Sequence, residues 1–227
     1  MKVGIFGDSF AAGGGWNDWA QNPHIKPWSY YVQKSNPDID ITNYAEAGSS
    51  IYFTYKNFIT HHHNFDKVIV CGTDSARIWL PNTPKEWDVT HSSITSHRVK
   101  SLNMCPTEIK DAISGYFNHI INIKEQDDIR MLQVCRMLQL RPDVLYFDCF
   151  APDIRYRHQH YPGIGPNYMC LGEISNLAPG GRIPTPDIRA NHMSEENNII
   201  FAAKITNWIN TSKFEMNITD FQKEEIK

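Results

Sequence analysis

Apolar and polar residues alternate along the chain in a way that predicts a sheet of parallel strands connected by helices. Four short apolar runs, bounded by Gly, Asp or Asn, have the length of buried strands. Helical patterns lie between them, and this alternation is typical of a parallel sheet with helices on both faces and right-handed crossovers. The predicted strands are Lys2 to Phe6, Asp40 to Tyr44, Lys67 to Cys71 and Val144 to Asp148.

Apolar residues at helical spacing, together with start and stop residues, predict the helices. Two short helices are expected, at Trp28 to Lys34 and at Ile51 to Ile59. A longer helical region begins at Pro106-Thr107 and ends at Arg141-Pro142, with a break near Gln126 to Asp128. Beyond that break the expected apolar face consists of Leu132, Cys135 and Leu138.

The chain is expected to form a single domain over residues 1–211. Residues 151–186 contain six of its 13 prolines and are expected to form a long irregular insertion. Ser194 is the expected N-cap of the final helix, which runs through Trp208. A polar tail then follows at residues 212–227.

The composition and charge of the chain argue against several classes of function. With 227 residues, 41% hydrophobic and 21% charged, the chain is typical of a soluble globular protein. A net charge of -3 without a basic block argues against nucleic acid as a partner. No apolar run approaches the length of a membrane span and no leader pattern is visible, so we expect no membrane partner and a cytoplasmic location. The five cysteines include no Cys-x-x-Cys pair, so neither zinc nor redox chemistry is indicated.

Candidates for ester hydrolysis lie at both ends of the chain. Gly7-Asp8-Ser9 follows the first strand and puts a serine at its carboxyl end, where open α/β sheets bind ligands. Ester hydrolysis needs a nucleophile, a base, a group that orients the base and donors for the oxyanion. Ser9 is the candidate nucleophile, His192 the base and Asp187 the nearest upstream carboxylate. Gly48, after the second strand, can bring a backbone N–H close to a ligand.

These landmarks resemble the SGNH, or GDSL-like, hydrolase family. Gly7-Asp8-Ser9 is similar to its nucleophile block, Gly48 to its glycine block and His192 to its histidine block, in the same order. The resemblance implies an α/β fold: a three-layer α/β/α sandwich with a central parallel sheet, flavodoxin-like in type. It also implies a serine esterase in which His192 takes the proton of Ser9, Asp187 orients His192, and N–H groups of Ser9 and Gly48 hold the oxyanion.

The resemblance extends to partners. It implies a small-molecule or carbohydrate ester as substrate, for instance an acetyl or other short acyl ester, and no metal or organic cofactor. The residues around His192 look similar to those of phage-encoded members, which would be compatible with association with a virion. The oligomeric state is left open.

The third block departs from the family pattern. The family has Gly-x-Asn after the third strand, and the asparagine amide donates to the oxyanion, whereas Gly72-Thr73-Asp74 places a carboxylate there. An ionised carboxylate cannot donate. Either Asp74 is protonated, or Thr73, Ser75 or a backbone N–H replaces it, or the oxyanion has two donors. Losing one such donor typically costs about a hundredfold to a thousandfold in rate.

The acidic residue that would orient the histidine also departs from the family pattern. The resemblance therefore does not decide the activity. The family places it three residues before the histidine, where this chain has Arg189, and Asp187 lies five before. A loop longer by two residues could still deliver Asp187. Two alternatives to hydrolysis remain: a catalytically weak or inactive binding module on the same fold, and an acyltransferase that uses a sugar hydroxyl in place of water.

Some polar residues are better explained by structure than by chemistry. Asp8 is expected to cap or brace the turn. The adjacent residues His61-His62-His63 are expected at a solvated helix end, because metal ligands on a helix lie three or four residues apart. His158 and His160 are expected on a loop surface.

Overall fold

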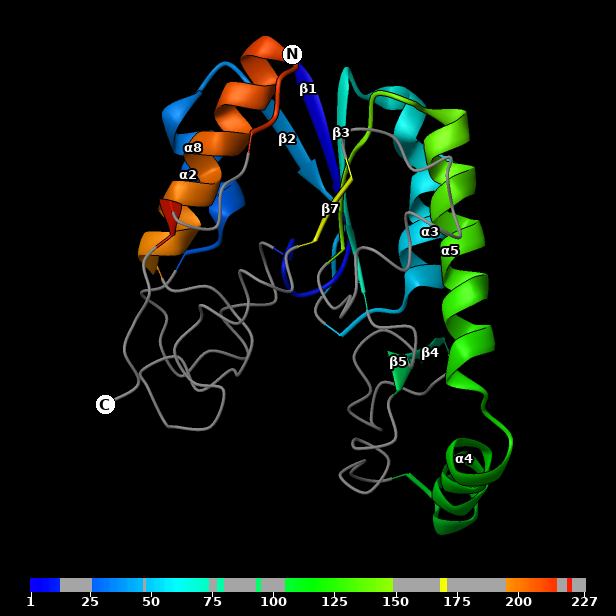
Figure 1. Ribbon diagram of the computed structural model, residues 1–227. Helices are drawn as coiled ribbons and strands as arrows, with labels where there is room; N and C mark the ends of the chain where they lie inside the picture. The colour runs from blue at the N-terminus through cyan, green and yellow to red at the C-terminus, as the bar shows by residue number, and fades with distance from the viewer. Residues whose placement is uncertain are drawn as a thin grey trace.

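A five-stranded sheet, in which every pair of neighbouring strands is parallel, forms the centre of the computed structural model (Figure 1). Its order is β2-β1-β3-β6-β7. The structure describes residues 1–12, 26–46, 48–73, 77–79, 93–94, 105–148, 168–170, 195–215 and 220–221. The strands are β1 (Lys2–Phe6), β2 (Asp40–Asn43), β3 (Lys67–Gly72), β6 (Leu145–Asp148) and β7 (Tyr168–Cys170), and a separate antiparallel pair joins β4 (Ile78–Trp79) to β5 (Ser93–Ile94).

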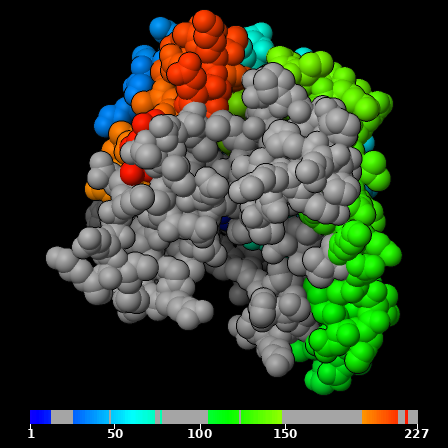
Figure 2. Space-filling view, in the orientation of Figure 1, coloured from blue at the N-terminus to red at the C-terminus, as the bar shows by residue number. Residues whose placement is uncertain are grey.

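Helices cover both faces of the sheet, which confirms the predicted α/β/α sandwich. On one face α2 (Trp28–Ser35) packs against α8 (Glu195–Thr211), and on the other α3 (Ile51–His61) packs against α5 (Ile123–Leu140). In the space-filling view, α8 in orange and α5 in green lie on opposite sides of the molecule (Figure 2). A short 3-10 helix, η1 (His62–Asn64), follows α3.

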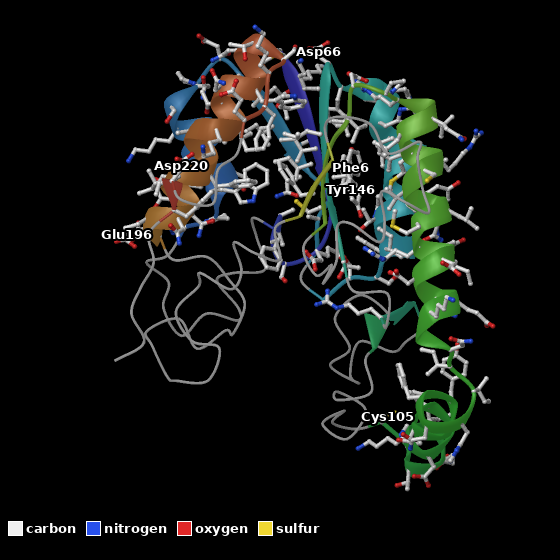
Figure 3. All side chains as sticks on the ribbon, in the orientation of Figure 1. Phe6, Asp66, Cys105, Tyr146, Glu196 and Asp220 are labelled. Atoms are coloured by element: carbon white, nitrogen blue, oxygen red, sulfur yellow. The ribbon has the colours of Figure 1, made fainter. Side chains whose placement is uncertain are left out.

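The alternation of side chains along each strand produces two cores, because successive residues of a strand point to opposite faces. Val3 and Ile5 of β1 pack with Trp28 of α2 and Trp208 of α8 on the first face. On the second face Phe6 packs with Tyr146 of β6 and with residues of α3 and α5, and Figure 3 labels these two side chains close together. The buried residues of the strands are therefore packed on both faces, and this packing holds the carboxyl ends of the strands in place.

The strand order defines where a ligand site is expected. From β1 the chain moves to β2 on one side and then crosses to β3 on the other, so the winding reverses between β1 and β3. Open α/β sheets bind ligands outside the carboxyl ends of their strands, at the point where the strand order reverses. The candidate residue Ser9 follows β1, and the candidates Thr73 and Asp74 follow β3 in the sequence.

The predicted break in the long helical region is in the wrong place. The chain breaks at 120–122, between α4 (Thr107–His119) and α5, rather than at 126–128. Asn122 explains the difference, because its side chain accepts hydrogen bonds from the backbone N–H groups of Lys124 and Glu125 and so caps α5.

The expected apolar face of α5 is one residue out of phase. Leu132 is 65% exposed, and Cys135 and Leu138 are only half-buried. The helix instead turns a neighbouring stripe toward α3 and the sheet, and that stripe consists of Arg130, Met131, Val134 and Met137.

The region expected to be an irregular insertion contains the edge strand β7, which pairs with β6. The other residues of 151–186 lie outside the described part. In the predicted tail, Phe221 is buried against the first core. Within the described part of the chain, no helix has the combined length and apolar character needed to cross a membrane.

Candidate active site

Ser9 lies in a tight turn directly after β1. The carbonyl of Asp8 accepts hydrogen bonds from the backbone N–H groups of Ala11 (3.0 Å) and Ala12 (2.8 Å), and Ser9 within this turn is half-buried. Gly7 has a φ of 155° and is pressed against Cys71 of β3, where a Cβ would lie 2.7 Å from the Cys71 Cβ. Glycine is therefore required at the start of the turn.

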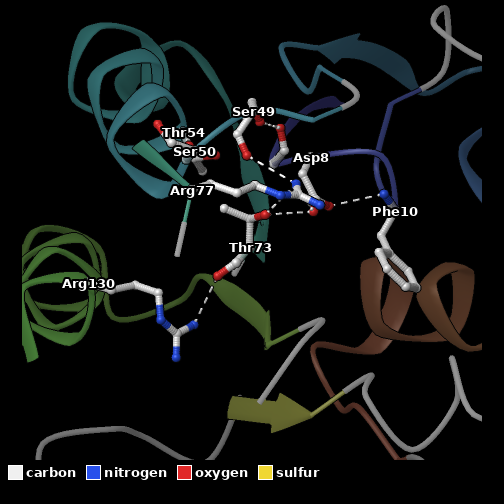
Figure 4. Close-up of polar contacts among 9 residues, drawn as sticks. Asp8, Phe10, Ser49, Ser50, Thr54, Thr73, Arg77 and Arg130 are labelled. Carbon is white, nitrogen blue, oxygen red and sulfur yellow. Dashed lines mark hydrogen bonds and ion pairs between the residues drawn. The ribbon is translucent and has the colours of Figure 1, made fainter. Parts of the chain in front are cut away.

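Asp8 is fully buried and braces this turn. Its Oδ1 accepts the backbone N–H of Phe10 at 3.1 Å, so the bond spans Ser9. Its Oδ2 accepts the Thr73 hydroxyl at 2.8 Å and Nη1 of Arg77 at 3.0 Å (Figure 4). The bracing role expected from the sequence is thus confirmed, and the brace reaches across to the end of β3.

Burial and charge act in opposite directions on Asp8. Loss of water raises the pKa of this carboxyl, and the Arg77 guanidinium, the Phe10 N–H and the Thr73 hydroxyl oppose that rise. Glu46, in the loop after β2, has its pKa raised to about 7 by burial. Two carboxyl groups with raised pKa values therefore belong to the loops at this edge of the sheet.

The glycine loop after β2 is held against the turn that contains Ser9. Gly7 offers its carbonyl to the backbone N–H of Glu46 and to the Ser49 hydroxyl, both at 3.0 Å. Gly48 lies between these two residues with a φ of 81°, a left-handed conformation that favours glycine. Ser50 then caps α3 by accepting from the Phe53 N–H. The backbone of Gly48 is thus placed in the loop that touches the residue two before Ser9.

The hydroxyl of Thr73, a candidate oxyanion donor, points toward Asp8 and Arg77. The residue is fully buried, and its hydroxyl donates to Asp8 while it accepts from Arg77 Nη1 at 2.6 Å. A hydroxyl has one hydrogen. In this structure the hydrogen of Thr73 is therefore engaged with Asp8.

Two arginines at the end of β3 were not identified from the sequence. Arg77 contacts Asp8 and Thr73, and Arg130 of α5 donates to the Thr73 carbonyl at 3.3 Å while it pairs with Asp127 at 2.9 Å. Arg77 carried no signal, since it is an isolated arginine in a loop. Arg130 would have been visible as a charged residue on the buried stripe of α5 had the phase of that helix been assigned correctly.

Several candidate residues lie outside the described part of the chain. They are Asp74, Ser75, Asp187 and His192. The structure describes the three adjacent histidines at the end of α3 and in η1, where His61 stacks on Tyr44 and His62 on Phe58. Among the described residues, no group of His, Cys, Asp and Glu is arranged to hold a metal ion.

Comparison with known proteins gives matches among solved structures. No family model and no curated protein sequence matches the chain. A lipase/acylhydrolase from Enterococcus faecalis has 13% identity and a TM-score of 0.45, covering 96% of this chain and 100% of that one. A putative lipolytic protein of the G-D-S-L family from Desulfitobacterium hafniense has 12% identity and a TM-score of 0.47, covering 91% and 98%. An acetyl xylan esterase has 14% identity and a TM-score of 0.46, covering 93% and 100%. Over at least 91% of its length, this chain is thus similar to lipolytic proteins of the G-D-S-L type and to esterases, with low sequence identity.

Proposed function

We propose that the protein is a serine hydrolase that cleaves an ester through an acyl-enzyme on Ser9. The observation that carries the proposal is the braced turn at the carboxyl end of β1. Ser9 is half-buried there, at the reversal of winding in the sheet, and the residues on either side of it are joined by the Asp8–Phe10 hydrogen bond. A nucleophile held in this way loses little freedom when substrate arrives.

His192 is the proposed base, and the packing of α8 supports it. The Trp28 indole N–H donates to the carbonyl of Phe10, the residue after Ser9, at 2.7 Å. The backbone N–H of Trp28 donates to the Asn198 side chain in the first turn of α8 at 3.0 Å. Trp28 therefore connects the nucleophile turn to the start of α8, and His192 precedes Asn198 by only six residues.

The proposed reaction follows the usual logic of serine hydrolysis. His192 takes the proton of Ser9, whose oxygen attacks the ester carbonyl, and Asp187 orients the imidazole and stabilises its charged form. Backbone N–H groups of Ser9 and Gly48 hold the oxyanion. His192 then gives its proton to the leaving alcohol, and water releases the acyl group. The proposed substrates are short acyl esters of small molecules or carbohydrates.

A fluorophosphonate probe with peptide mapping tests this proposal without knowledge of the substrate. The adduct is expected on Ser9, because Ser49 is fully buried and its hydroxyl is bonded to Gly7. Ser9→Ala should abolish labelling and p-nitrophenyl acetate hydrolysis, while Ser35→Ala, at an exposed position at the end of α2, should change neither. An adduct on another serine, or none on the folded protein, would contradict the proposal.

Acceptor competition separates hydrolysis from acyl transfer. If water is the acceptor, adding a sugar alcohol to the p-nitrophenyl acetate assay should leave acetate as the main product. A predominance of acetylated sugar would instead identify a transferase. A folded protein that binds acetylated carbohydrate but neither reacts with the probe nor turns over ester would be a binding module.

A further inference from the structure

Arg77 joins the ends of three segments that are distant in sequence. Its Nη1 lies 3.0 Å from Asp8 Oδ2 after β1, 3.2 Å from the Ser49 carbonyl before α3, and 2.6 Å from Thr73 Oγ1 after β3 (Figure 4). The arginine side chain is 15% exposed and that of Asp8 is fully buried. One guanidinium group thus holds the nucleophile turn, the glycine loop and the end of β3 in a common arrangement.

The charge of Arg77 also decides the state of Asp8. A carboxylate removed from water is unfavourable unless it is paired and hydrogen-bonded. Among the interactions that favour the ionised form of Asp8, the charge of Arg77 is the largest, ahead of the Phe10 N–H and the Thr73 hydroxyl. Without Arg77, Asp8 would therefore tend to take up a proton or draw in water.

The geometry points to Arg77 as a positioning residue for Ser9, acting through the ionised Asp8 and its bond to the Phe10 N–H. This inference rests on the proposed role of Ser9 as nucleophile. Asp8 and Phe10 flank Ser9 in sequence, so a change in the Asp8–Phe10 bond changes the backbone on both sides of the serine. Arg77 needs no contact with substrate for this role.

Arg77→Met is the first variant, since it removes the charge while keeping a long apolar stem. We expect the rate of fluorophosphonate labelling at Ser9 to fall about a hundredfold, the effect typical of a small displacement of a reacting group. With p-nitrophenyl acetate, the loss should appear in kcat with little change in KM, because the geometry of the nucleophile is altered rather than the binding of the ester.

Arg141→Met is the matched control. Arg141 is similarly buried, at 14% exposure, pairs with Asp143 at 3.0 Å and donates to the carbonyls of His62 and Asp66. Its contacts lie before β3 and before β6, at the amino edge of the sheet and away from Ser9. It should lower Tm without changing the labelling rate of the folded protein. Equal losses of labelling in the two folded variants would overturn the inference.

A double variant tests whether the charge of Asp8 carries the effect. Protonation of the proposed base His192 lowers activity on the acid side of the pH profile in every variant. In Arg77→Met this decline should set in at a higher pH, because Asp8 then protonates more readily. Adding Asp8→Asn removes that ionisable group, so the additional decline should disappear and about tenfold of the lost rate should return, as expected for coupled neighbours. A double variant whose losses simply multiply would contradict action through Asp8.

Labelling of the wild-type protein separates the two proposals. If wild-type Ser9 is not labelled, the proposed function fails and this inference falls with it. If wild-type Ser9 is labelled and folded Arg77→Met is labelled equally fast, only the inference is overturned. Should Arg77→Met not fold, Arg77→Lys decides. Its single ammonium cannot reproduce the planar guanidinium, so labelling at least about threefold slower with an unchanged KM supports the inference, and a wild-type rate overturns it.

Discussion

The hydroxyl of Thr73 donates a 2.8 Å hydrogen bond to the carboxylate of Asp8, and both residues are fully buried. This bond joins the ends of β1 and β3, the two neighbouring parallel strands between which the winding of the sheet reverses. The threonine within Gly72-Thr73-Asp74 therefore braces the turn that contains Ser9, through the carboxylate of Asp8.

Thr73→Val should lower the free energy of unfolding by about 1.5–3 kcal/mol, the usual worth of a hydrogen bond to a charged group. Valine keeps the shape and removes the donor. Thr73→Ser keeps the donor and should retain most of the labelling rate at Ser9. Urea unfolding of both variants measures the effect. Undiminished stability of Thr73→Val combined with a large loss of rate would place the hydroxyl at the substrate instead.

Gly7→Ala should destabilise the protein by about 1–3 kcal/mol, as overpacking does. The added Cβ would lie 2.7 Å from both the Cβ and the carbonyl oxygen of Cys71. Gly115→Ala is the control, because a Cβ at this position in α4 meets nothing within 4 Å and alanine is the better helix former. Thermal unfolding should therefore show opposite shifts in the two variants.

His192→Ala should abolish both fluorophosphonate labelling and ester turnover while the fold persists. The prediction follows from the proposed role of this imidazole as the base that activates Ser9. Circular dichroism and Tm report on the fold, and labelling reports on the nucleophile. A large fall in Tm with labelling preserved would show that the histidine is structural.

Asp187→Asn should lower kcat strongly with little change in KM, because the bond to the imidazole strengthens as its charge develops. Asp74→Asn should leave the rate level or raise it, since it restores a neutral amide where an oxyanion donor is expected. Steady-state kinetics of both variants provides the comparison. If the two variants exchange phenotypes, Asp74 orients the base and the role proposed for Asp187 must be withdrawn.

Glu46 should make the stability fall as the pH rises. Its pKa is raised in the folded protein from an ordinary value of 4.5 to about 7. Below 4.5 both states hold the proton and the stabilising contribution is complete; it is lost as the pH rises through about 7, because the unfolded state has already released the proton. The Tm of the wild type relative to Glu46→Gln should therefore decrease between about pH 5 and about pH 8. Glu108→Gln, which removes an exposed carboxyl from α4, is the control for the change in net charge.

The fold followed from sequence wherever short-range signals agreed. β1 begins and ends as predicted, because Val3 to Phe6 form a buried apolar run that Gly7 ends. The starts of α2 and α3 at Trp28 and Ile51 were likewise predicted. In α5 the apolar residues outnumber the buried stripe, so periodicity alone could not distinguish Met131, which is buried, from Leu132, which is not. Three-dimensional packing decided between them.

The edge strand β7 and the contacts of Arg77 could not be predicted from the sequence, because both depend on residues far apart in the chain. β7 has only three residues in a segment rich in proline and glycine, and only its pairing with β6 makes it a strand. The turns that contain Ser9 and Gly48 could be predicted, because backbone turns leave a local sequence signature. The contacts of Arg77 could not, because its partners Asp8 and Ser49 are 69 and 28 residues away and nothing beside it marks the contact.

The position of β1 between β2 and β3 has a consequence for biosynthesis. Asp8 is translated 65 residues before Thr73, its hydrogen-bond donor, and 69 residues before Arg77. While the chain emerges from the ribosome, this carboxylate must remain hydrated until the third strand docks, and contacts between residues so far apart form slowly. Ser9 is thus synthesised early and acquires the braced surroundings of its turn late, so a nascent chain released before Arg77 would contain the serine without the environment that we propose makes it reactive.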